Sequence, residues 1–329
     1  MKHAPIVAVV LLLWGCSSDP QKAKLKYLES GQRYMKKGQH DAAIIQLRNA
    51  LAQDPRFVDA LHLLAQAYVA KRQPREAYAA LKQAADIDPN RLDVRLSLGR
   101  FYLAAGDFKQ AAEQADFVVA RDPKSAAGYQ VLGGTLAAQK ENEGARKAFE
   151  KAVELAPKDP SSLVSLGLIL AAAGDRSEAE RNFRAATEAD PRHLPAWLAL
   201  ADLYRRQERL PDAEQVLQTA IERNPDEINL YLASADLLLA QAKTEPLEAL
   251  LRKLRERLRK PETALALGDF FASRNQREQA MAEYRRGLEI APKNLDIKAR
   301  LVERHLAAGQ IKEAERWNSE ILGAKPKDV

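Results

Sequence analysis

The sequence predicts an all-α solenoid, a stack of helix pairs that needs no central core. The first observation is a proline that recurs every 34 residues, at Pro55, Pro89, Pro123, Pro157, Pro191 and Pro225, and again from Pro292 to Pro326. A fixed period of this length is typical of stacked repeats. The second observation is that no segment alternates apolar and polar residues as a half-buried strand does. Because the interval from Pro225 to Pro292 is 67 residues, one repeat between them lacks a residue.

Each repeat is predicted to be two closely packed helices. When positions are counted from Lys24, so that Pro55 is position 32, small residues fall at positions 8 and 20 of nearly every unit. Position 8 holds Gly31, Ala65, Gly99, Gly133, Gly167, Ala201, Ala235 and Gly268. Position 20 holds Ala43, Ala77, Ala111, Ala145, Ala179, Ala213, Ala280 and Ala314. Between the helices, glycines such as Gly38, Gly106 and Gly174 favour a turn with positive φ. The proline then ends the second helix.

These columns resemble the tetratricopeptide repeat (TPR), whose pattern places W/Y/L, L, G/A, Y, A, F/L, A and P at positions 4, 7, 8, 11, 20, 24, 27 and 32. The match covers residues 24–328 in about nine units. The resemblance implies a right-handed superhelix in which the first helix of each unit lines a concave groove. It also implies a scaffold that holds other proteins, with neither a cofactor nor chemistry of its own.

The first residues differ in composition from the repeats. A basic start at residues 1–3 precedes an apolar run over residues 4–13, which is too short to span a bilayer (~20 residues) but fits a secretory signal. Leu13-Trp14-Gly15-Cys16 resembles the bacterial lipobox, although Trp14 replaces its usual small residue. The resemblance implies that residues 1–15 are a lipoprotein signal peptide and that Cys16, the only cysteine, carries acyl chains such as palmitate. A plain signal peptide or an uncleaved anchor stays open.

The residue after the cysteine indicates to which bacterial membrane a lipoprotein is sorted. By resemblance to the bacterial sorting rule, Ser17 favours the outer membrane, with the protein facing the periplasm. Residues 16–23 are then the lipidated cysteine and a short polar tether, whose seven residues after the cysteine reach ~25 Å when extended. Two or three acyl chains, at ~0.8 kcal/mol per buried CH₂, would hold such a protein firmly on a membrane. The first repeat is therefore predicted to lie close to the lipid surface.

The repeats divide into residues 24–227 (repeats 1–6), the degenerate repeat 7 over residues 228–260, and residues 261–328 (repeats 8 and 9). Repeat 7 has Leu247 in place of the alanine and no proline, so we expect its second helix to run on to Lys260. A leucine in an alanine-sized contact separates the helices, which predicts a change of superhelical pitch. Basic side chains on this helix are a candidate contact for anionic lipid headgroups or polysaccharide: Arg252, Lys253, Arg255, Arg257, Arg259 and Lys260. A solvated outer face is the alternative.

In the TPR family the groove is lined by positions 2, 5, 9, 12 and 13. The candidate groove residues here are Gln32, Gln66, Arg100, Gln130, Gly134, Ala137, Ala138, Val164, Leu168, Ala171, Ala172, Leu198, Asp202, Asp236, Asp269 and Glu303. They are polar in the first units, small or apolar in the middle and acidic at the end. Gly134, Ala137 and Ala138 are predicted to leave space for a partner's side chain. We expect a bound peptide or helix, apolar in its middle and basic toward one end. The alternative is that small residues serve packing and the carboxylates are solvated.

Charge and residue spacing argue against other functions. The 51 Lys+Arg and 45 Asp+Glu are interspersed and give a net charge of only +6, which does not favour nucleic-acid binding. The five histidines lack metal-ligand spacing, and no catalytic motif stands out.

The sequence therefore predicts a non-enzymatic scaffold of an envelope assembly, secretion or export machinery. An accessory role in exopolysaccharide export, through the basic helix, is the runner-up. Homo-oligomerisation through the C-terminal helix, with Trp317 and Ile321, also stays open.

Overall fold

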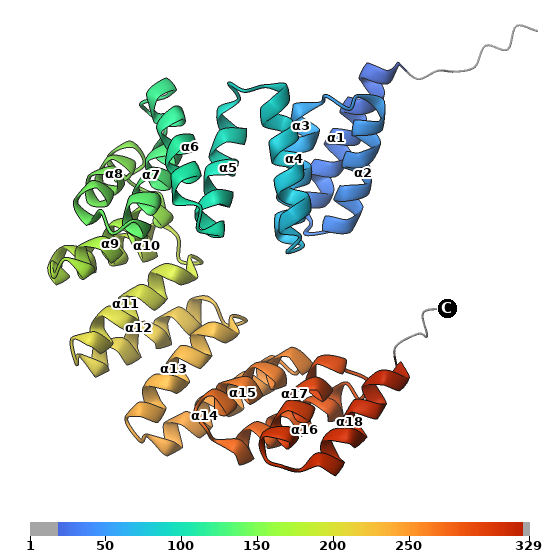
Figure 1. The fold of residues 1–329 in the computed structure, drawn as a ribbon. Helices are drawn as coiled ribbons and strands as arrows, with labels where there is room; N and C mark the ends of the chain where they lie inside the picture. The colour runs from blue at the N-terminus through green and yellow to red at the C-terminus, as the bar shows by residue number, and fades with distance from the viewer. Residues whose placement is uncertain (1–18, 325–329) are drawn as a thin grey trace, which may run out of the picture. The chain divides into compact units, whose positions relative to one another are not determined.

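The computed structural model describes residues 19–324, which form eighteen α-helices and no strand (Figure 1). The chain divides between Leu155 and Ala156 into two compact units. The predicted all-α solenoid is confirmed, since consecutive helices pack as pairs along the chain. None of the helices within residues 19–324 combines the length and the apolar character needed to cross a membrane.

The first unit contains four helix pairs. Their bounds are α1 (Pro20–Lys36) with α2 (His40–Gln53), α3 (Val58–Ala70) with α4 (Pro74–Ile87), α5 (Leu92–Ala105) with α6 (Phe108–Arg121), and α7 (Ala126–Ala138) with α8 (Asn142–Leu155). First helices of successive pairs also contact each other, as α1 contacts α3 and α5 contacts α7. One side of this unit is therefore formed by first helices.

The second unit contains five helix pairs. Their bounds are α9 (Pro160–Ala172) with α10 (Arg176–Ala189), α11 (Leu194–Arg206) with α12 (Leu210–Arg223), α13 (Ile228–Ala240) with α14 (Thr244–Arg257), α15 (Pro261–Ser273) with α16 (Arg277–Ile290), and α17 (Leu295–Ala307) with α18 (Ile311–Ala324). Here α9, α11, α13 and α15 contact one another in sequence. They form the side on which the candidate groove residues of this unit lie.

The turn inside each pair has one residue in the left-handed region. The predicted glycines adopt it, with φ of 68° at Gly38, 79° at Gly106 and 90° at Gly174. The equivalent position of five other pairs holds a residue with a side chain, namely Arg72, Lys140, Glu208, Ala242 and Asn275. The 34-residue period therefore fixes the turn geometry even where the sequence lacks the glycine that this geometry favours.

The small residues at position 8 permit the close helix approach that the sequence predicts. A Cβ added to Gly31 would lie 2.8 Å from Leu47, and one added to Gly133 would lie 2.7 Å from Phe149. Both neighbours stand at position 24 of the second helix. Because real Cβ contacts are not this short, an alanine at either glycine would force the facing Leu47 or Phe149 side chain to shift.

Two sequence-based expectations about helix ends are wrong. Helix α1 begins at Pro20, so residues 20–23 are helical and not part of an extended tether; the Asp19 side chain accepts the Gln21 N–H, and proline fits the first helical turn. Helix α14 ends at Arg257 and does not run on to Lys260. Only three residues then precede α15, so the residue missing from repeat 7 is lost from this connection.

Two of the links between repeats are held by aromatic side chains at position 4. The indole Nε1 of Trp197 donates to the Pro191 carbonyl at 3.0 Å, and the hydroxyl of Tyr231 donates to the Pro225 carbonyl at 3.1 Å. Asn224 also donates to the Pro191 carbonyl, at 2.8 Å. These bonds satisfy carbonyls that a proline-terminated helix leaves without partners. They fix how one repeat enters the next.

Candidate functional site

The strongest candidate site is a groove on the first-helix side of the second unit. A hollow of about 400 Å³ lies between the ends of α9 and α11 and the start of α10. Its apolar part includes Leu168, which is 54% exposed, with Ala171, Ala172 and Ala199. The predicted groove residues of repeats 5 and 6 are therefore brought together in an accessible apolar surface.

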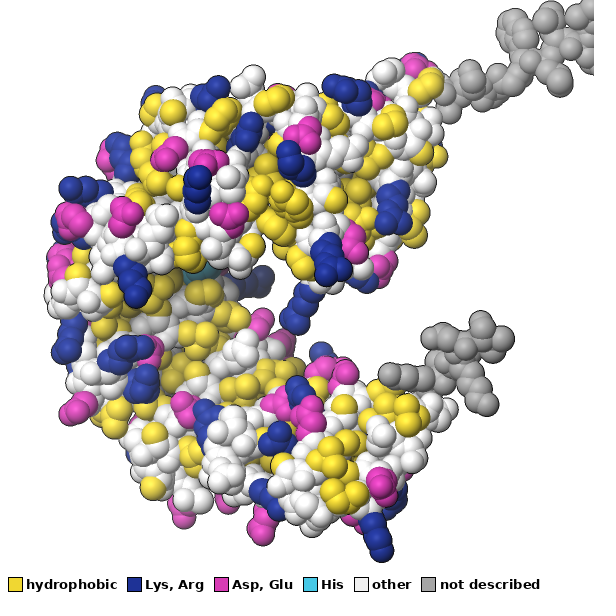
Figure 2. Space-filling view, viewed as in Figure 1, with side chains coloured by type: hydrophobic (Ala, Val, Ile, Leu, Met, Phe, Trp, Pro, Cys, Tyr) yellow, Lys and Arg dark blue, Asp and Glu magenta, His cyan; other side chains and the backbone are white. Residues whose placement is uncertain are grey.

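A second hollow continues this surface toward α13. Its volume is about 330 Å³, and Leu198, Ala233 and Asp236 are among the residues that line it. Asp202 lines both hollows. We call the surface formed by Leu168, Ala171, Ala172, Leu198, Asp202 and Asp236 the second-unit groove. Figure 2 shows apolar side chains on the visible surface interspersed with basic and acidic ones.

Asp202 is held between two arginines of its own helix. Arg205 donates to Oδ1 at 2.5 Å, and Nε of Arg206 donates to Oδ2 at 2.6 Å. Partial burial opposes ionisation of Asp202, but the bonds from Arg205 and Arg206 outweigh it and hold the pKa of this carboxyl below its usual value. Two guanidinium groups share one carboxylate, so the local charge is positive.

The remaining predicted carboxylates are also paired with arginines. Nε of Arg274 donates to Asp236 at 2.9 Å. Arg300 lies 3.0 Å from Asp269, which also accepts the Tyr284 hydroxyl at 2.7 Å. Arg300 contacts Glu303 at 3.3 Å as well. Each of these four carboxylates therefore has a cationic neighbour while its side chain stays exposed to solvent. Whether they bind a partner stays a prediction.

Two predicted groove features are corrected by packing. Val164 is only 7% exposed, so it belongs to the core and offers a partner almost no surface. A Cβ on Gly134 would lie 2.9 Å from Leu103 of α5. The space predicted beside Gly134, Ala137 and Ala138 is therefore partly filled by this leucine, which the column pattern alone does not place there.

The other first-unit candidates remain accessible. Gln32, Gln66, Arg100 and Ala138 are exposed, whereas Gln130 and Ala137 are half-buried. Gln32, Gln66 and Arg100 stand at position 9 of α1, α3 and α5, whereas Gln130, Ala137 and Ala138 stand at positions 5, 12 and 13 of α7. The surface near Gln32, Gln66 and Arg100 is polar, and Ala138 adds an exposed apolar position to it.

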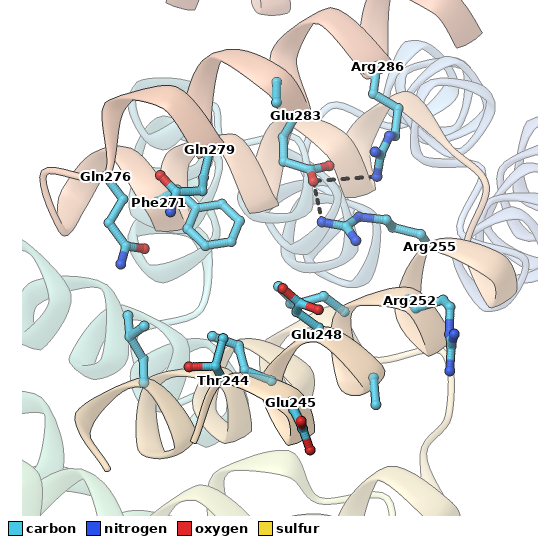
Figure 3. Close-up of a pocket in the computed structure, with 15 residues that line it drawn as sticks. Thr244, Glu245, Glu248, Arg252, Arg255, Phe271, Gln276, Gln279, Glu283 and Arg286 are labelled. Atoms are coloured by element: carbon cyan, nitrogen blue, oxygen red, sulfur yellow. Dashed lines mark hydrogen bonds and ion pairs between the residues drawn. The ribbon is translucent and has the colours of Figure 1, made fainter. Parts of the chain in front are cut away.

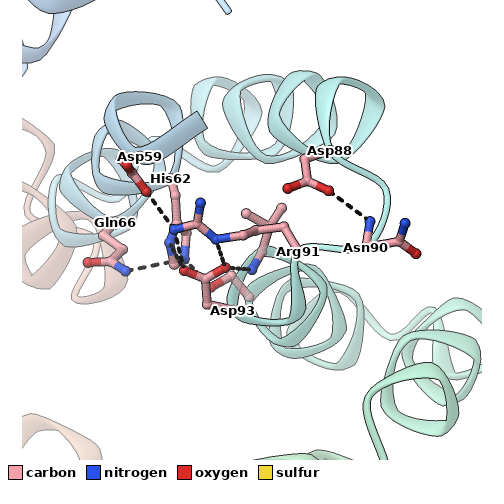
Figure 4. Close-up of polar contacts among 9 residues, drawn as sticks. Asp59, His62, Gln66, Asp88, Asn90, Arg91 and Asp93 are labelled. Carbon is pink, nitrogen blue, oxygen red and sulfur yellow. Dashed lines mark hydrogen bonds and ion pairs between the residues drawn. The ribbon is translucent and has the colours of Figure 1, made fainter. Parts of the chain in front are cut away.

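A polar cluster between α3 and α5 was not predicted (Figure 4). Nε2 of His62 lies 2.7 Å from the Ser97 hydroxyl, and Nδ1 lies 3.4 Å from Asp93. Arg91 bridges Asp93 to Asp59, donating to Asp59 at 2.5 Å. Asp59 and His62 occupy positions 2 and 5 of their repeat, so the family's groove positions would have pointed to them.

Burial decides the charge of His62. Desolvation lowers the pKa of His62 below its usual value, and the attraction of the nearby Asp93 only partly opposes this effect. The ring is therefore neutral at pH 7. A neutral imidazole both donates and accepts, and both ring nitrogens of His62 are already engaged within this cluster.

The basic residues of repeat 7 fall into two sets. Arg255 donates to Glu283, whose side chain is 3% exposed, and Arg257 donates to Asp226 at 2.8 Å. Within residues 19–324, Arg252, Lys253, Arg259 and Lys260 are exposed and have no ion pair. Only these four remain available to an anionic ligand, because Arg255 and Arg257 are already in ion pairs.

A cavity of about 680 Å³ lies beside these residues, between α14 and α16 (Figure 3). Its apolar lining includes Leu247, Leu251 and Phe271, and Glu283 points across it toward Arg255 and Arg286. In the same repeat, α13 and α14 are less closely packed than the helices of any other pair in the described chain. The predicted separation by Leu247 agrees with this packing.

The predicted lipidation at Cys16 lies outside the described residues. Within residues 19–324 no group of three or more His, Cys, Asp or Glu side chains is placed to hold a metal ion.

Paired helices with an accessible first-helix surface define a helical-repeat scaffold. Family models described as "Tetratricopeptide repeat" match residues 164–228 and residues 69–133, 103–166 and 271–329, and one described as "TPR repeat" matches residues 31–71. Together they cover well over half of the chain, which belongs to the tetratricopeptide repeat family. This membership agrees with a scaffold for protein–protein interactions.

Solved structures of similar fold support the same class. PilF of Pseudomonas aeruginosa is 19% identical with a TM-score of 0.54, and the match covers 67% of this chain and 99% of that one. PilW, described as a widely conserved type IV pilus biogenesis factor, is 20% identical with a TM-score of 0.52, over 60% of this chain and 92% of that one. At these identities the likeness concerns the fold. No curated protein matches the sequence.

Proposed function

We propose that this protein is a membrane-anchored scaffold of the bacterial cell envelope that binds a segment of a partner protein in the second-unit groove. The observation that carries the proposal is the pair of adjoining hollows around Asp202, the first of which is lined by the exposed Leu168. Concave sites with an apolar floor and a few polar groups at the rim are the usual place for peptide and ligand binding. The groove takes an extended segment or a helix side by side with α11.

The envelope location rests on the leader sequence. Acylation of Cys16 would tether α1 within a few residues of the lipid surface, since α1 begins at Pro20. Lipid labelling with radioactive palmitate tests this part. We expect incorporation into the full chain and none into Cys16→Ser, which would then be released from membranes. Equal labelling of both chains would exclude the anchor.

The class of machinery is suggested by likeness of fold. Both PilF and PilW share the fold over most of their own length, and PilW is described as a pilus biogenesis factor. A surface-filament or secretion assembly is therefore the first place to look for the partner. The partner itself is identified only by experiment.

Crosslinking in cells tests the groove directly. A photoreactive phenylalanine derivative replaces Ala172 on the groove, and in a matched chain it replaces Ala189, which is exposed on α10. We expect one protein adduct at position 172, mapped by mass spectrometry to one segment, and none at position 189. Adducts of glycan or lipid alone, or the same adducts at both positions, would contradict the proposal.

A second candidate function, the binding of an anionic ligand, rests on the exposed basic residues of repeat 7. Arg252, Lys253, Arg259 and Lys260 are exposed and form no ion pair within the described chain, so repeat 7 is also proposed to contact anionic lipid or polysaccharide. Reversal of all four charges should abolish sedimentation of Cys16→Ser with vesicles that contain anionic phospholipid. Unchanged sedimentation would exclude lipid contact through this surface.

A further inference from the structure

We infer that the segment bound in the second-unit groove carries acidic residues next to an apolar side chain, and not the basic residues that the column of carboxylates indicates. This inference rests on the proposed function, because it names the chemistry of the partner for the same site. It follows from where the arginines of the second unit lie, which the repeat columns do not show.

The floor of the groove selects an apolar side chain. Leu168 is 54% exposed beside Ala171, Ala172 and Ala199, and Phe183 closes one wall of the hollow. Covering an exposed leucine removes apolar surface from water, which stabilises a complex in proportion to the area covered. A side chain of leucine or phenylalanine size fits a hollow of about 400 Å³.

The rim of the groove is cationic. Arg176 and Arg206 line the same hollow as Leu168, and Arg205 lines the adjoining one. Against these three guanidinium groups stand two carboxylates: Asp202, which Arg205 and Arg206 already share, and Asp236, which accepts a bond from Arg274 outside both hollows. The net charge around the hollow is therefore positive.

The arginines also keep hydrogen-bond donors free. Arg206 contacts Asp202 through Nε alone, its side chain is 72% exposed, and its two terminal nitrogens have no partner in the described chain. Arg176 is exposed and forms no ion pair there. A planar guanidinium with both terminal nitrogens free is suited to a carboxylate, which it can bind through two parallel bonds.

A basic partner finds no free anion in this groove. Asp202 and Asp236 both accept arginine bonds already, and Asp269 accepts bonds from Arg300 and Tyr284. A partner lysine would compete with these guanidinium groups and would lie beside the surplus positive charge. Charge complementarity therefore selects a segment with aspartate or glutamate within a few residues of its apolar anchor.

Binding of defined peptides to the purified full chain in detergent tests the inference. Three peptide pools share a central leucine or phenylalanine, and their flanking residues are drawn from Asp and Glu, from Lys and Arg, or from Ser and Gln. We expect the acidic pool to bind at least tenfold more tightly than the basic pool, with the neutral pool between them. Equal affinities, or tighter binding of the basic pool, would overturn the inference.

Matched variants assign the preference to the rim. The double variant Arg176→Glu with Arg206→Glu should lose the preference for acidic peptides or reverse it, and Arg176→Gln with Arg206→Gln should reduce it about tenfold while keeping the fold. Arg181→Glu is the control, because Arg181 is exposed on α10, outside both hollows. An unchanged preference in the glutamine variant would contradict the assignment.

The crosslinked segment from cells separates this inference from the proposed function. A protein adduct at Ala172 whose segment is acidic and apolar supports both. A protein adduct with a basic segment leaves the scaffold function standing and overturns the inference. Absence of any protein adduct contradicts the proposed function itself.

Discussion

At the scale of single residues, the sequence predicts where the groove carboxylates stand but not which arginines pair with them. Position 9 is a column of carboxylates from Asp202 onward, and the columns alone suggest an acidic surface. Arg205 and Arg206 reach Asp202 from the next turn of the same helix, whereas Arg274 reaches Asp236 from 38 residues away. The column pattern therefore identifies where the groove residues stand. The net charge of the groove surface follows from the arginines that lie beside the carboxylates.

A substitution in the turn of repeat 7 tests the backbone at this scale. Ala242 has φ of 54°, a conformation that costs a residue with a Cβ roughly 1–2 kcal/mol. Ala242→Gly should therefore raise the free energy of unfolding by about 0.5–1 kcal/mol, after the greater flexibility of glycine in the unfolded chain is included. Chemical denaturation monitored by helical circular dichroism measures the change.

The control for this substitution is Ala249→Gly, an exposed position inside α14. There glycine should lower the free energy of unfolding by about 1 kcal/mol, because it has the lower helix propensity. Equal destabilisation by both glycines would contradict the left-handed turn.

The His62 cluster predicts a pH dependence of stability. Burial disfavours protonation of His62 more than Asp93 promotes it, so the folded-state pKa lies below the unfolded value of 6.5. As the pH falls below 6.5 toward the folded-state pKa, the unfolded chain binds this proton more readily than the folded chain. The free energy of unfolding therefore decreases over this range. His62→Gln lacks this loss and keeps the polar contacts with Ser97 and Asp93 within reach.

Urea unfolding of both chains at pH 7.5 and pH 5.5 provides the measurement. We expect the wild-type chain to lose more stability than His62→Gln between these two values. A larger loss in the variant would mean that Asp93, Asp59 and Arg91 favour the imidazolium, contrary to the effect of burial.

At the scale of helices, the repeat period is a reliable guide to everything except the irregular unit. The 34-residue spacing correctly predicts the pairs, the turn at Gly38, Gly106 and Gly174, and the close approach at position 8. It does not predict where α14 ends, because the long basic run has high helix propensity throughout. The end at Arg257 is set by the connection to α15, which begins at Pro261.

Loose packing of repeat 7 predicts faster local opening. Helices α13 and α14 are the least closely packed pair, and a cavity of about 680 Å³ separates α14 from α16. Backbone amides in residues 240–262 should therefore exchange with solvent faster than the equivalent amides in residues 206–227 of repeat 6. Native-state hydrogen exchange read by mass spectrometry measures both segments in one sample. Uniform protection across the two would contradict a hinge in repeat 7.

At the scale of the whole molecule, family membership and function rest on different evidence. The TPR family follows from residues repeated nine times, so the sequence alone is sufficient for it. The groove needs side-chain exposure, which the sequence misjudged at Val164 and beside Gly134, where core packing and Leu103 take the space. The partner's charge depends on arginines that lie outside the acidic column. Each of these depends on which side chains meet in three dimensions, whether within one helix, as at Asp202, or between helices, as at Gly134.

The central claim is that the second-unit groove binds a segment of another protein. The most direct measurement is the affinity of the segment captured at Ala172, made as a synthetic peptide, for the full chain and for Leu168→Glu, with Ile45→Glu as a control at an exposed apolar residue of the first unit. We predict that Leu168→Glu raises Kd by at least tenfold while Ile45→Glu leaves it unchanged. The same Kd for Leu168→Glu and the unaltered chain would contradict the account.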